Sequence, residues 1–297
     1  MLRILVTGAS GQLGMEFRDL AGRYDKLDFI FADRKQLDIT DNDALNAFFK
    51  EYKVDYVING AAYTNVEQAE REREVAEAIN VLGPMYLSRL SKCHNFRLIH
   101  VSTDYVFDGR SHFPYKESYP AYPTCVYGIT KFRGENVVSR MNPEAYVIRT
   151  SWLYSSHRKN FVKTIMSISE KQDTLNVVAD QVGTPTYARD LAKAILTIIN
   201  RLEDDPDSHE PGIYHYANEG ITSWYDFAHE ILTLSSSEAT VTPIDSKSFL
   251  TNVSRPYYSV LDKQKIKNQF DISIPHWKES LKSCITLIKK QQCQEVY

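Results

Sequence analysis

Leu2-Arg-Ile-Leu-Val-Thr-Gly-Ala-Ser-Gly-Gln-Leu-Gly14 opens the chain with an apolar run that leads directly into a glycine-rich turn. Such a run is typical of a buried strand. The glycines of the turn, Gly8, Gly11 and Gly14, are spaced three residues apart and come just before or within a predicted helix over 12–22. This arrangement allows a tight turn, a close backbone approach by a pyrophosphate, and a helix N-terminus that faces the phosphate charge. It predicts a dinucleotide-binding site; the alternative is a plain glycine-rich turn.

Strands and helices are predicted to alternate along the first half of the chain. After the first helix we expect strands at 28–32, 54–58, 97–101 and 145–148, an edge-like segment at 35–41, and helices at 42–52 and 66–93, the last kinked or broken near Gly83-Pro84. This rhythm is typical of a doubly wound parallel sheet. We therefore predict an α/β protein with a Rossmann-type dinucleotide-binding domain over 1–150.

The alternation fades beyond Arg149, and we predict a smaller α+β substrate-binding lobe over 151–297. A helix near 187–201 is expected to return to the sheet. The other elements expected in this lobe are a helix at 159–171, strands at 212–217 and 240–244, and helices at 223–234 and near 245–251, 262–268 and 276–290. The acidic segment 203–210 is interpreted as a solvated loop.

Composition excludes several classes of protein. The 297 residues are 43% hydrophobic and 25% charged, as in ordinary globular proteins. The formal charge, 35 − 38 = −3, offers no basic surface for nucleic acid or an acidic membrane. No apolar run approaches the roughly 20 residues of a membrane span. The cysteines lack zinc-ligand spacing, so we interpret them as reduced thiols of a cytoplasmic protein; they are Cys93, Cys125, Cys284 and Cys293.

Asp33 and Arg34 follow the second predicted strand, and Asp33 lies about 20 residues beyond Gly14. An acid at this place commonly binds the ribose hydroxyls of the adenosine half of a dinucleotide. The neighbouring arginine could instead accept a 2′-phosphate. The sequence therefore predicts NADPH or NADH as cofactor and does not choose between them.

Tyr127 and Lys131 lie four residues apart within Tyr122-Pro-Thr-Cys-Val-Tyr-Gly-Ile-Thr-Lys-Phe-Arg-Gly-Glu135, so they share one face of a helix. A phenol is a weak acid with a reference pKa of about 10. An ammonium one turn away favours the phenolate and is expected to lower that pKa. Such a pair suits the delivery of a proton to a carbonyl oxygen. Because the chain has 19 tyrosines, an isolated match would more often be a solvated helix face.

Ser102-Thr-Asp-Tyr-Val-Phe-Asp-Gly109 follows the strand predicted at 97–101. Ligands of open α/β sheets gather at the carboxyl ends of the strands. We therefore expect Thr103 to hold a substrate oxygen beside the Tyr127 hydroxyl. The alternative for Thr103 is a simple turn cap.

These features together resemble the extended short-chain dehydrogenase/reductases and, within them, the dTDP-4-dehydrorhamnose reductase family. The motifs near the start are shared by the whole superfamily, whereas the Thr-Ser-Trp and Asp-Gln-x-Gly-x-Pro-Thr motifs are more selective. The matching segments are Gly11-Gln-Leu-Gly14, Leu37-Asp-Ile-Thr40, Ala61-Ala-Tyr-Thr64, Ser102–Gly109, Tyr127–Lys131, Arg149-Thr-Ser-Trp-Leu-Tyr154, Asn160-Phe-Val162, Asp180-Gln-Val-Gly-Thr-Pro-Thr186, Ser223-Trp-Tyr225 and Arg255-Pro256.

The resemblance implies reduction of the C4 keto group of dTDP-4-dehydro-β-L-rhamnose to dTDP-β-L-rhamnose, the last step of dTDP-L-rhamnose biosynthesis. Tyr127 would donate the proton, and Lys131 would bind the nicotinamide ribose. The residues implied to contact the cofactor, besides this pair and the Gly8 turn, are Gly11, Gln12, Leu13, Asp33, Asp38, Ile39, Ala62, Tyr63 and Thr64. Those expected to contact the substrate are Thr103, Asp104, Trp152, Asn160 and Arg255, the last because its forked guanidinium suits a diphosphate.

Two departures from the family pattern stand out. The loop Ser155–Lys159 lacks the glycine and asparagine common before Asn-Phe. Some relatives form dimers through a magnesium site built from glutamates; Glu16 matches one of these, but Arg189 and Leu287 stand where the others would be. We therefore predict no metal, and either a monomer or a homodimer.

Two other functions remain open on the sequence. One is a reductase or epimerase that acts on another nucleotide-linked 4-ketohexose. The other is a non-catalytic regulatory subunit like that of methionine adenosyltransferase, which shares the glycine turn and the Tyr/Lys pair. Ser151-Trp152 argues against the regulatory subunit, since that relative lacks the tryptophan. In the favoured interpretation the partner is a dTDP-sugar, with no nucleic acid and no membrane.

Overall fold

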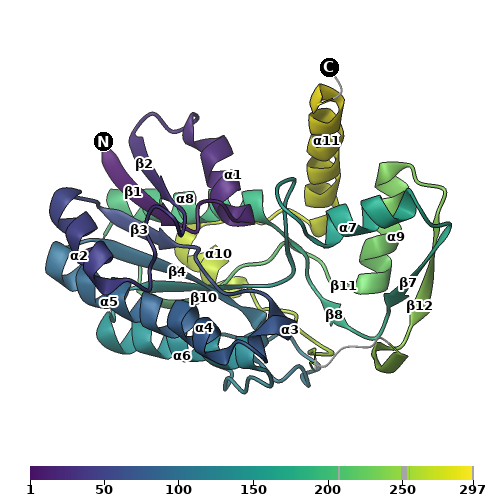
Figure 1. Cartoon of the computed structure of the whole chain (residues 1–297), viewed down its shortest axis with the longest axis horizontal. Helices are drawn as coiled ribbons and strands as arrows, with labels where there is room; N and C mark the ends of the chain where they lie inside the picture. The colour runs from purple at the N-terminus through teal and green to yellow at the C-terminus, as the bar shows by residue number, and fades with distance from the viewer. Residues whose placement is uncertain (207, 249–252, 254, 296–297) are drawn as a thin grey trace.

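A parallel sheet of six strands forms the centre of the larger part of the molecule (Figure 1). The computed structural model describes residues 1–206, 208–248, 253 and 255–295. The strands lie in the order β10-β5-β4-β3-β1-β2, and all neighbours pair in parallel. From β1 the chain adds β2 on one side and then β3 and the later strands on the other side, so the switch point lies between β1 and β3. They are β1 (Leu2–Thr7), β2 (Leu27–Ala32), β3 (Tyr56–Asn59), β4 (Arg97–Thr103), β5 (Tyr146–Thr150) and β10 (Gly212–His215).

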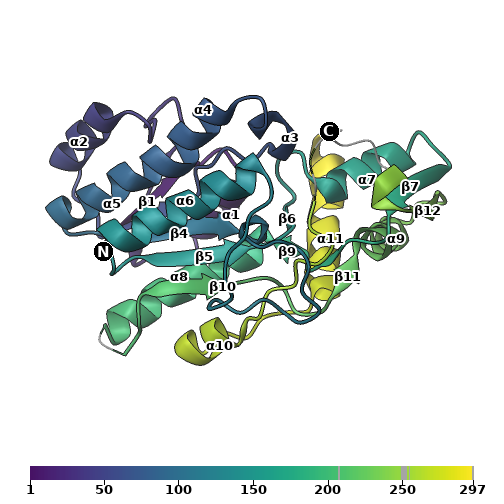
Figure 2. The ribbon, with the colours of Figure 1, turned by 90° about the horizontal axis from the view of Figure 1, so that it is seen from below.

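Helices cover both faces of this sheet (Figure 2). Successive side chains of a strand point to opposite faces, and both faces here are apolar. Leu5, Val57 and Leu98 pack under α2, α5 and α6, whereas Ile4 and Ile58 pack under α1, α8 and α10. The predicted doubly wound α/β fold is therefore confirmed. The bounds of the helices are α1 (Gln12–Ala21), α2 (Asn42–Glu51), α5 (Gly83–His94), α6 (Val126–Met141), α8 (Ala188–Asp204) and α10 (Gln264–Phe270).

The predicted edge segment at 35–41 is wrong: these residues form turns. The carboxylate of Asp33 accepts backbone N–H groups of Lys35 and Gln36, and Asp38 accepts that of Thr40. Aspartates that bond to the backbone nearby compete with strand pairing, because they satisfy the amides that a ladder needs.

The long helix predicted at 66–93 is several pieces. It consists of α3 (Val66–Ala69), α4 (Arg73–Glu77), a π-helical turn over Ala78–Leu82, and α5. Gly83-Pro84 does not break it, because Pro84 lies in the first turn of α5, where a missing N–H is tolerated. The π turn places the buried amide of Asn80 between α6 and the Tyr63 backbone.

Helix α8, at the place of the helix predicted near 187–201, packs beside α1 against the central sheet. The strand expected at 212–217 was assigned to the smaller lobe, and this is wrong. It is β10, which pairs in parallel with β5 as the sixth strand of the central sheet. The few residues of β10 contain no sequence signal that identifies β5 as the pairing strand. The chain also passes through the smaller lobe between β5 and β10. The proposed division of the chain at residue 150 stays a prediction.

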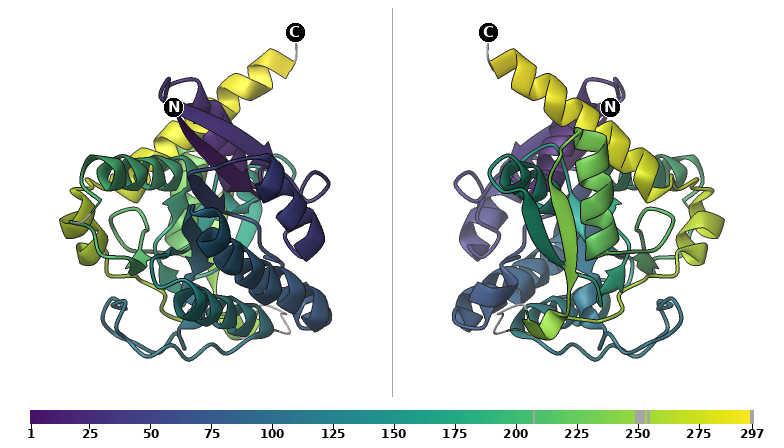
Figure 3. Two further views of the ribbon diagram at one scale, coloured as in Figure 1. Left: turned by 90° about the vertical axis from the view of Figure 1, so that its left-hand side faces the viewer. Right: turned by 90° about the vertical axis from the view of Figure 1, so that its right-hand side faces the viewer.

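A second apolar core holds the smaller lobe together. It lies between α7 (Phe161–Ser169), α9 (Trp224–Ser235) and the paired strands β7 (Thr174–Val178) and β12 (Thr240–Ile244). The long helix α11 (Trp277–Glu295) crosses beside α9, and its C-terminal end projects beyond the body (Figure 3). Strand β7 was not predicted. The helix expected near 245–251 is seen only as a 3₁₀ turn over Ser246–Ser248, and 249–252 lie outside the described residues.

Short pairings complete the lobe. They are β6 (Leu153–Tyr154) with β9 (Thr186–Tyr187), and β8 (Val182–Gly183) with β11 (Thr222–Ser223). Among the described residues, no helix has both the length and the apolar content to cross a bilayer.

Candidate active site

A cavity of about 660 Å³ lies at the carboxyl ends of the central strands. The glycine turn after β1, the ends of β3 and β4, the start of α6 and the segment after β5 all contribute to its wall. This is the switch point between β1 and β3, where open α/β sheets bind their ligands. The fold thus gathers into one place groups that are far apart in the sequence.

The glycine turn is required by its close packing. Gly8 has a φ of 67°, and a β-carbon there would come 2.7 Å from the Ala61 backbone nitrogen. A β-carbon on Gly14 would lie 2.5 Å from the Cα of Ala9, so this glycine lets α1 pack against the turn. Gly11 precedes α1 without a capping side chain. The first amides of α1 are therefore open to an anion.

Several buried polar atoms of this wall lack a partner. They include Oε1 of Gln12, Oγ of Ser102 and Oγ1 of Thr150, none of which finds a hydrogen bond within the described chain. Buried polar atoms are nearly always bonded, so unpaired ones that face a cavity indicate a polar ligand. Ser102 and Thr150 were not predicted as site residues. Thr150 ends β5, and the rule that ligands gather at strand ends could have found it.

Thr103, Tyr127 and Lys131, the three residues predicted to be catalytic, all line the cavity. Thr103 is the last residue of β4, and the two others lie one turn apart near the start of α6. The Tyr127 hydroxyl lies beside the Thr103 side chain. Thr103 Oγ1 also donates to Asp104 Oδ1 at 3.0 Å, and the Lys131 ammonium donates to the Val101 carbonyl oxygen at 2.7 Å.

The electrostatics of the Tyr/Lys pair differ from the expectation. Burial raises the pKa of Tyr127, and the neighbouring Thr103 hydroxyl only partly opposes this. Lys131 does not lower the pKa of the phenol here, because its ammonium is directed to the backbone of β4. Burial also lowers the pKa of Lys131 to about 8, against the attraction of Glu135. At neutral pH the phenol therefore keeps its proton.

Asp104 lies beside this group and is fully buried. Burial raises the pKa of its carboxyl to about 7, and the hydrogen bond from Thr103 opposes the shift. A buried acid that titrates near neutrality is more typical of functional sites than of structural ion pairs.

The far end of the cavity is lined by Arg34, Asp38 and Ile39, whereas Asp33 and Tyr63 do not line it. Arg34 reaches across to Asp38, with 3.0 Å between Nε and Oδ2. The Asp33 carboxylate is taken up by the backbone of its own turn, and the Tyr63 hydroxyl donates to Glu72. Of the remaining predicted cofactor contacts, those on the wall are Gly8, Gly11, Gln12, Leu13, Ala62 and Thr64.

Trp152 separates this cavity from a second one of about 650 Å³ in the smaller lobe. Its ring stacks on Trp224, with 3.6 Å between centroids and 10° between planes, and its backbone has a φ of 47°. Trp152 lines the first cavity and Trp224 the second. Arg255 also lines the second cavity, and it pairs with Glu67 at 3.4 Å.

Asn160 is placed differently from the prediction of a substrate contact. Its Oδ1 caps α7 by accepting the Lys163 amide, and its Nδ2 donates to the carbonyl oxygen of Ser155 at 2.7 Å. The residue lines neither of the two cavities. In this structure it holds its own loop.

Glu16, Asp19 and His157 bring potential metal ligands within 4.8 Å of one another. A fixed cation already lies among them: the Arg189 guanidinium contacts Glu16 at 2.7 Å and Asp19 at 2.6 Å. The fully buried Glu16 carboxylate is thus neutralised by a residue of α8. The prediction that no metal binds here stays a prediction.

Comparison with known proteins identifies the family of the chain. The family described as RmlD substrate binding domain matches residues 2–290. A dTDP-4-dehydrorhamnose reductase of Aggregatibacter actinomycetemcomitans is 39% identical, over 95% of this chain and 98% of the relative. A solved dTDP-4-dehydrorhamnose reductase of Clostridium acetobutylicum is 41% identical, with a TM-score of 0.91 over 97% of this chain and 100% of that one.

A further solved structure, dTDP-4-dehydrorhamnose reductase of Bacillus anthracis in complex with NADP, is 34% identical with a TM-score of 0.89, over 97% of this chain and 99% of that one. The matches run through both the central sheet and the smaller lobe. The chain belongs to the RmlD substrate binding domain family, that of the dTDP-4-dehydrorhamnose reductases.

Proposed function

We propose that this chain reduces the C4 keto group of dTDP-4-dehydro-β-L-rhamnose to dTDP-β-L-rhamnose with NADPH or NADH. The observation that carries the proposal is the meeting of Thr103, Tyr127 and Lys131 with the glycine turn in one cavity. Family membership supports this choice of substrate, since several relatives carry the name of that reductase, although others of similar identity are named as ketoreductases of other dTDP-sugars. The cofactor supplies the hydride when bound.

Tyr127 is proposed to deliver the proton. As C4 is reduced, negative charge develops on its oxygen, and a positioned acid stabilises that charge by giving up a proton. The raised pKa of Tyr127 keeps the proton on the phenol until this moment. Thr103 lies beside the same hydroxyl and is proposed to hold the sugar oxygen in line. Lys131 of α6, whose ammonium donates to the Val101 carbonyl oxygen of β4, is proposed to hold the nicotinamide ribose.

The wall of the first cavity fits a dinucleotide. The tight turn at Gly8, the uncapped start of α1 and the unpaired atoms of Gln12, Ser102 and Thr150 are suited to its phosphates and amides. We propose that Arg34, the exposed cation at the far end, contacts a 2′-phosphate. Contacts by Asp33 and Tyr63 remain predictions.

Arg34→Ala should raise the dissociation constant of NADPH by about tenfold, since a hydrogen bond to a charged group contributes roughly 1.5 kcal/mol or more. NADH lacks the 2′-phosphate, so its dissociation constant should change less than twofold. Titration of both cofactors by protein fluorescence measures this. Equal losses of affinity for NADPH and NADH would show that Arg34 does not contact the 2′-phosphate.

The second cavity is proposed to hold the nucleotide half of the substrate. Trp224 and Tyr257 offer rings to a base, and Arg255 is the cation proposed to meet the diphosphate. Trp152, between the two cavities, would then lie against the sugar.

Trp152→Ala should raise the KM for the sugar nucleotide about tenfold or more, because it removes a large packing surface from the substrate. The dissociation constant of NADPH should stay nearly unchanged. Steady-state kinetics and cofactor titration separate the two. A variant that fails to fold would assign Trp152 to the core instead.

The proposed reaction is tested by offering the protein a set of dTDP-4-keto sugars with NADPH and identifying each product. Fastest consumption of dTDP-4-dehydro-β-L-rhamnose is expected. Preference for another 4-keto sugar would favour the alternative of a reductase that acts on another nucleotide-linked 4-ketohexose. An epimerase would turn over without added cofactor, and a regulatory subunit would turn over none.

The wider setting of the enzyme follows from the same proposal. A dTDP-sugar is the partner, and location in the cytoplasm, where NADPH and nucleotide sugars are made, is proposed with it. The four cysteines are free thiols in the structure, consistent with a reducing compartment. Monomer and homodimer both remain compatible with this function.

A further inference from the structure

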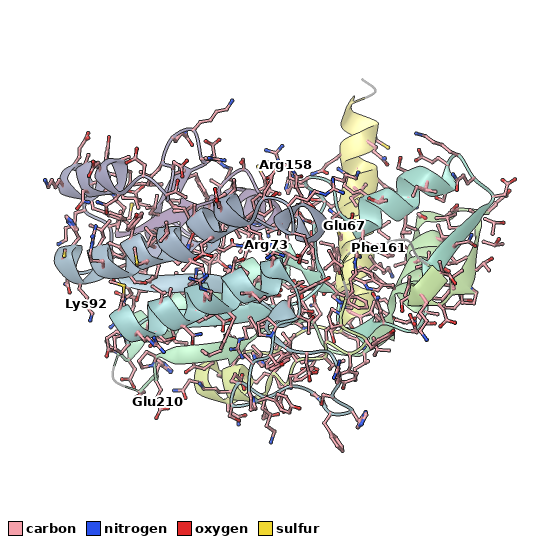
Figure 4. All side chains as sticks on the ribbon, turned by 60° about the horizontal axis from the view of Figure 1, so that its bottom comes forward. Glu67, Arg73, Lys92, Arg158, Phe161 and Glu210 are labelled. Carbon is pink, nitrogen blue, oxygen red and sulfur yellow. The ribbon has the colours of Figure 1, made fainter. Side chains whose placement is uncertain are left out.

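The loop Ser155–Lys159 carries two basic side chains to the dinucleotide cavity. Arg158 and Lys159 both line the cavity wall, as do Ser10 and Gly11 of the glycine turn. The Nε of Arg158 donates to the Ser10 carbonyl oxygen at 2.6 Å. Within the described part of the chain, neither side chain forms an ion pair. In Figure 4, Arg158 lies where the larger part of the molecule meets the smaller lobe.

The backbone at Arg158 is one that favours glycine. Its φ is 58°, in the left-handed region that side chains with a β-carbon rarely adopt. Asn160 maintains the conformation by donating to the carbonyl oxygens of Ser155, His157 and Arg158. Glycine would fit this position without strain, so the presence of arginine indicates a use for its guanidinium.

An ionic network fixes the loop to the dinucleotide-binding part. His157 Nε2 lies 2.9 Å from Asp19, and the Ser155 hydroxyl donates to Glu16 at 2.5 Å. Both carboxylates belong to α1, and both also contact Arg189 of α8. The helix whose uncapped N-terminus faces the cavity therefore also positions the loop opposite it. The cations and the open amides form two sides of one anion site.

We propose that Arg158, assisted by Lys159, binds the pyrophosphate of the dinucleotide, and that the network at Glu16 and Asp19 positions this loop for it. The inference rests on the proposed function, because it assumes that the cavity takes a dinucleotide. Arg158 uses only Nε on Ser10, so the far edge of its guanidinium is free to donate two parallel bonds to phosphate oxygens. The pyrophosphate is common to NADPH and NADH, so this contact serves both.

The test is the binding of NADPH, NADH and ADP-ribose to the full chain in the absence of sugar, measured by calorimetry. Arg158→Gly removes the guanidinium and also relieves the left-handed backbone, so any loss of affinity cannot come from added strain. We expect all three ligands to bind roughly 10-fold more weakly in this variant, as suits a charged hydrogen bond. The exposed Arg140 supplies a control, since Arg140→Gly carries the same charge change on the far end of α6.

The outcomes separate this inference from the proposed function. If the unmodified protein binds no dinucleotide, the proposed function itself fails. If it binds all three and Arg158→Gly binds them equally well, only the inference about this loop is wrong. A loss of affinity confined to NADPH would indicate that Arg158 contacts the 2′-phosphate, and this would also contradict the inference. Similar losses of affinity in the Arg140 variant would show that the effect comes from the change in net charge and not from a direct contact, and would also contradict the inference.

Discussion

Tyr127→Phe is expected to lower turnover by about 10²–10⁴, the usual contribution of a positioned acid, while fold and cofactor affinity survive. The change removes one oxygen and little volume. The phenol is partly buried, keeps its proton at neutral pH and lies beside the Thr103 side chain, where a sugar oxygen could receive that proton. Turnover with saturating NADPH is the measurement.

Tyr146→Phe is the matched control. Its hydroxyl is part-buried and donates to the His209 carbonyl oxygen, outside the cavity. The same atom is removed, so this variant should lose a little stability and almost no turnover. A loss of less than a few-fold in Tyr127→Phe would mean that another group donates the proton, with the buried Asp104 as the next to examine.

Arg149→Met is expected to reduce the free energy of unfolding by about 3–5 kcal/mol, because it leaves a buried carboxylate without its partner. Arg149 lies one residue before the end of β5, and its guanidinium contacts Glu135 of α6 at 2.7 and 2.9 Å. Both side chains are almost fully buried. This pair ties the helix that carries Tyr127 and Lys131 to the strand that carries Thr150. Urea unfolding followed by fluorescence measures the loss.

The double variant Arg149→Met with Glu135→Leu tests the cause. Replacing both partners by apolar groups of similar size is often nearly neutral, so most of the lost stability should return. Glu135 also raises the pKa of Lys131, so the ammonium should lose its proton at lower pH in the double variant. Full stability in the single variant would show that the pair contributes little.

The central sheet could be predicted from the sequence because its signals are local. Leu2–Thr7 and the other strands are apolar on both faces, and the glycine spacing after β1 identifies the ligand-binding edge. The Tyr127/Lys131 pair could be placed because helical spacing alone puts both side chains on one face. Short sequence motifs were therefore enough to predict which residues could carry the chemistry of the cavity.

Other features depended on tertiary contacts that short motifs do not carry. Strand β10 (Gly212–His215) finds β5 only after the chain has crossed the smaller lobe. The turn at 35–41 is set by aspartates that bond to the backbone. The direction of Lys131 toward β4, and hence its missing effect on the Tyr127 pKa, depends on burial that helical spacing does not reveal.

The charges around α1 show the same limit. Arg189 lies 173 residues from Glu16 in the chain, yet its guanidinium neutralises that buried carboxylate. The loop that carries Arg158 appeared only as a departure from the family pattern. Its use became visible when the fold brought it onto the glycine turn.

The central claim is that hydride from the nicotinamide reaches C4 of the sugar. It is tested most directly by incubating dTDP-4-dehydro-β-L-rhamnose with the protein and NADPH. The NADPH carries deuterium at C4 of the nicotinamide, on one face of the ring in a first sample and on the other face in a second. The account predicts dTDP-β-L-rhamnose with deuterium at C4, formed in step with cofactor oxidation and detected by NMR. A product without deuterium at C4, or a sugar converted with no cofactor oxidised, would contradict it.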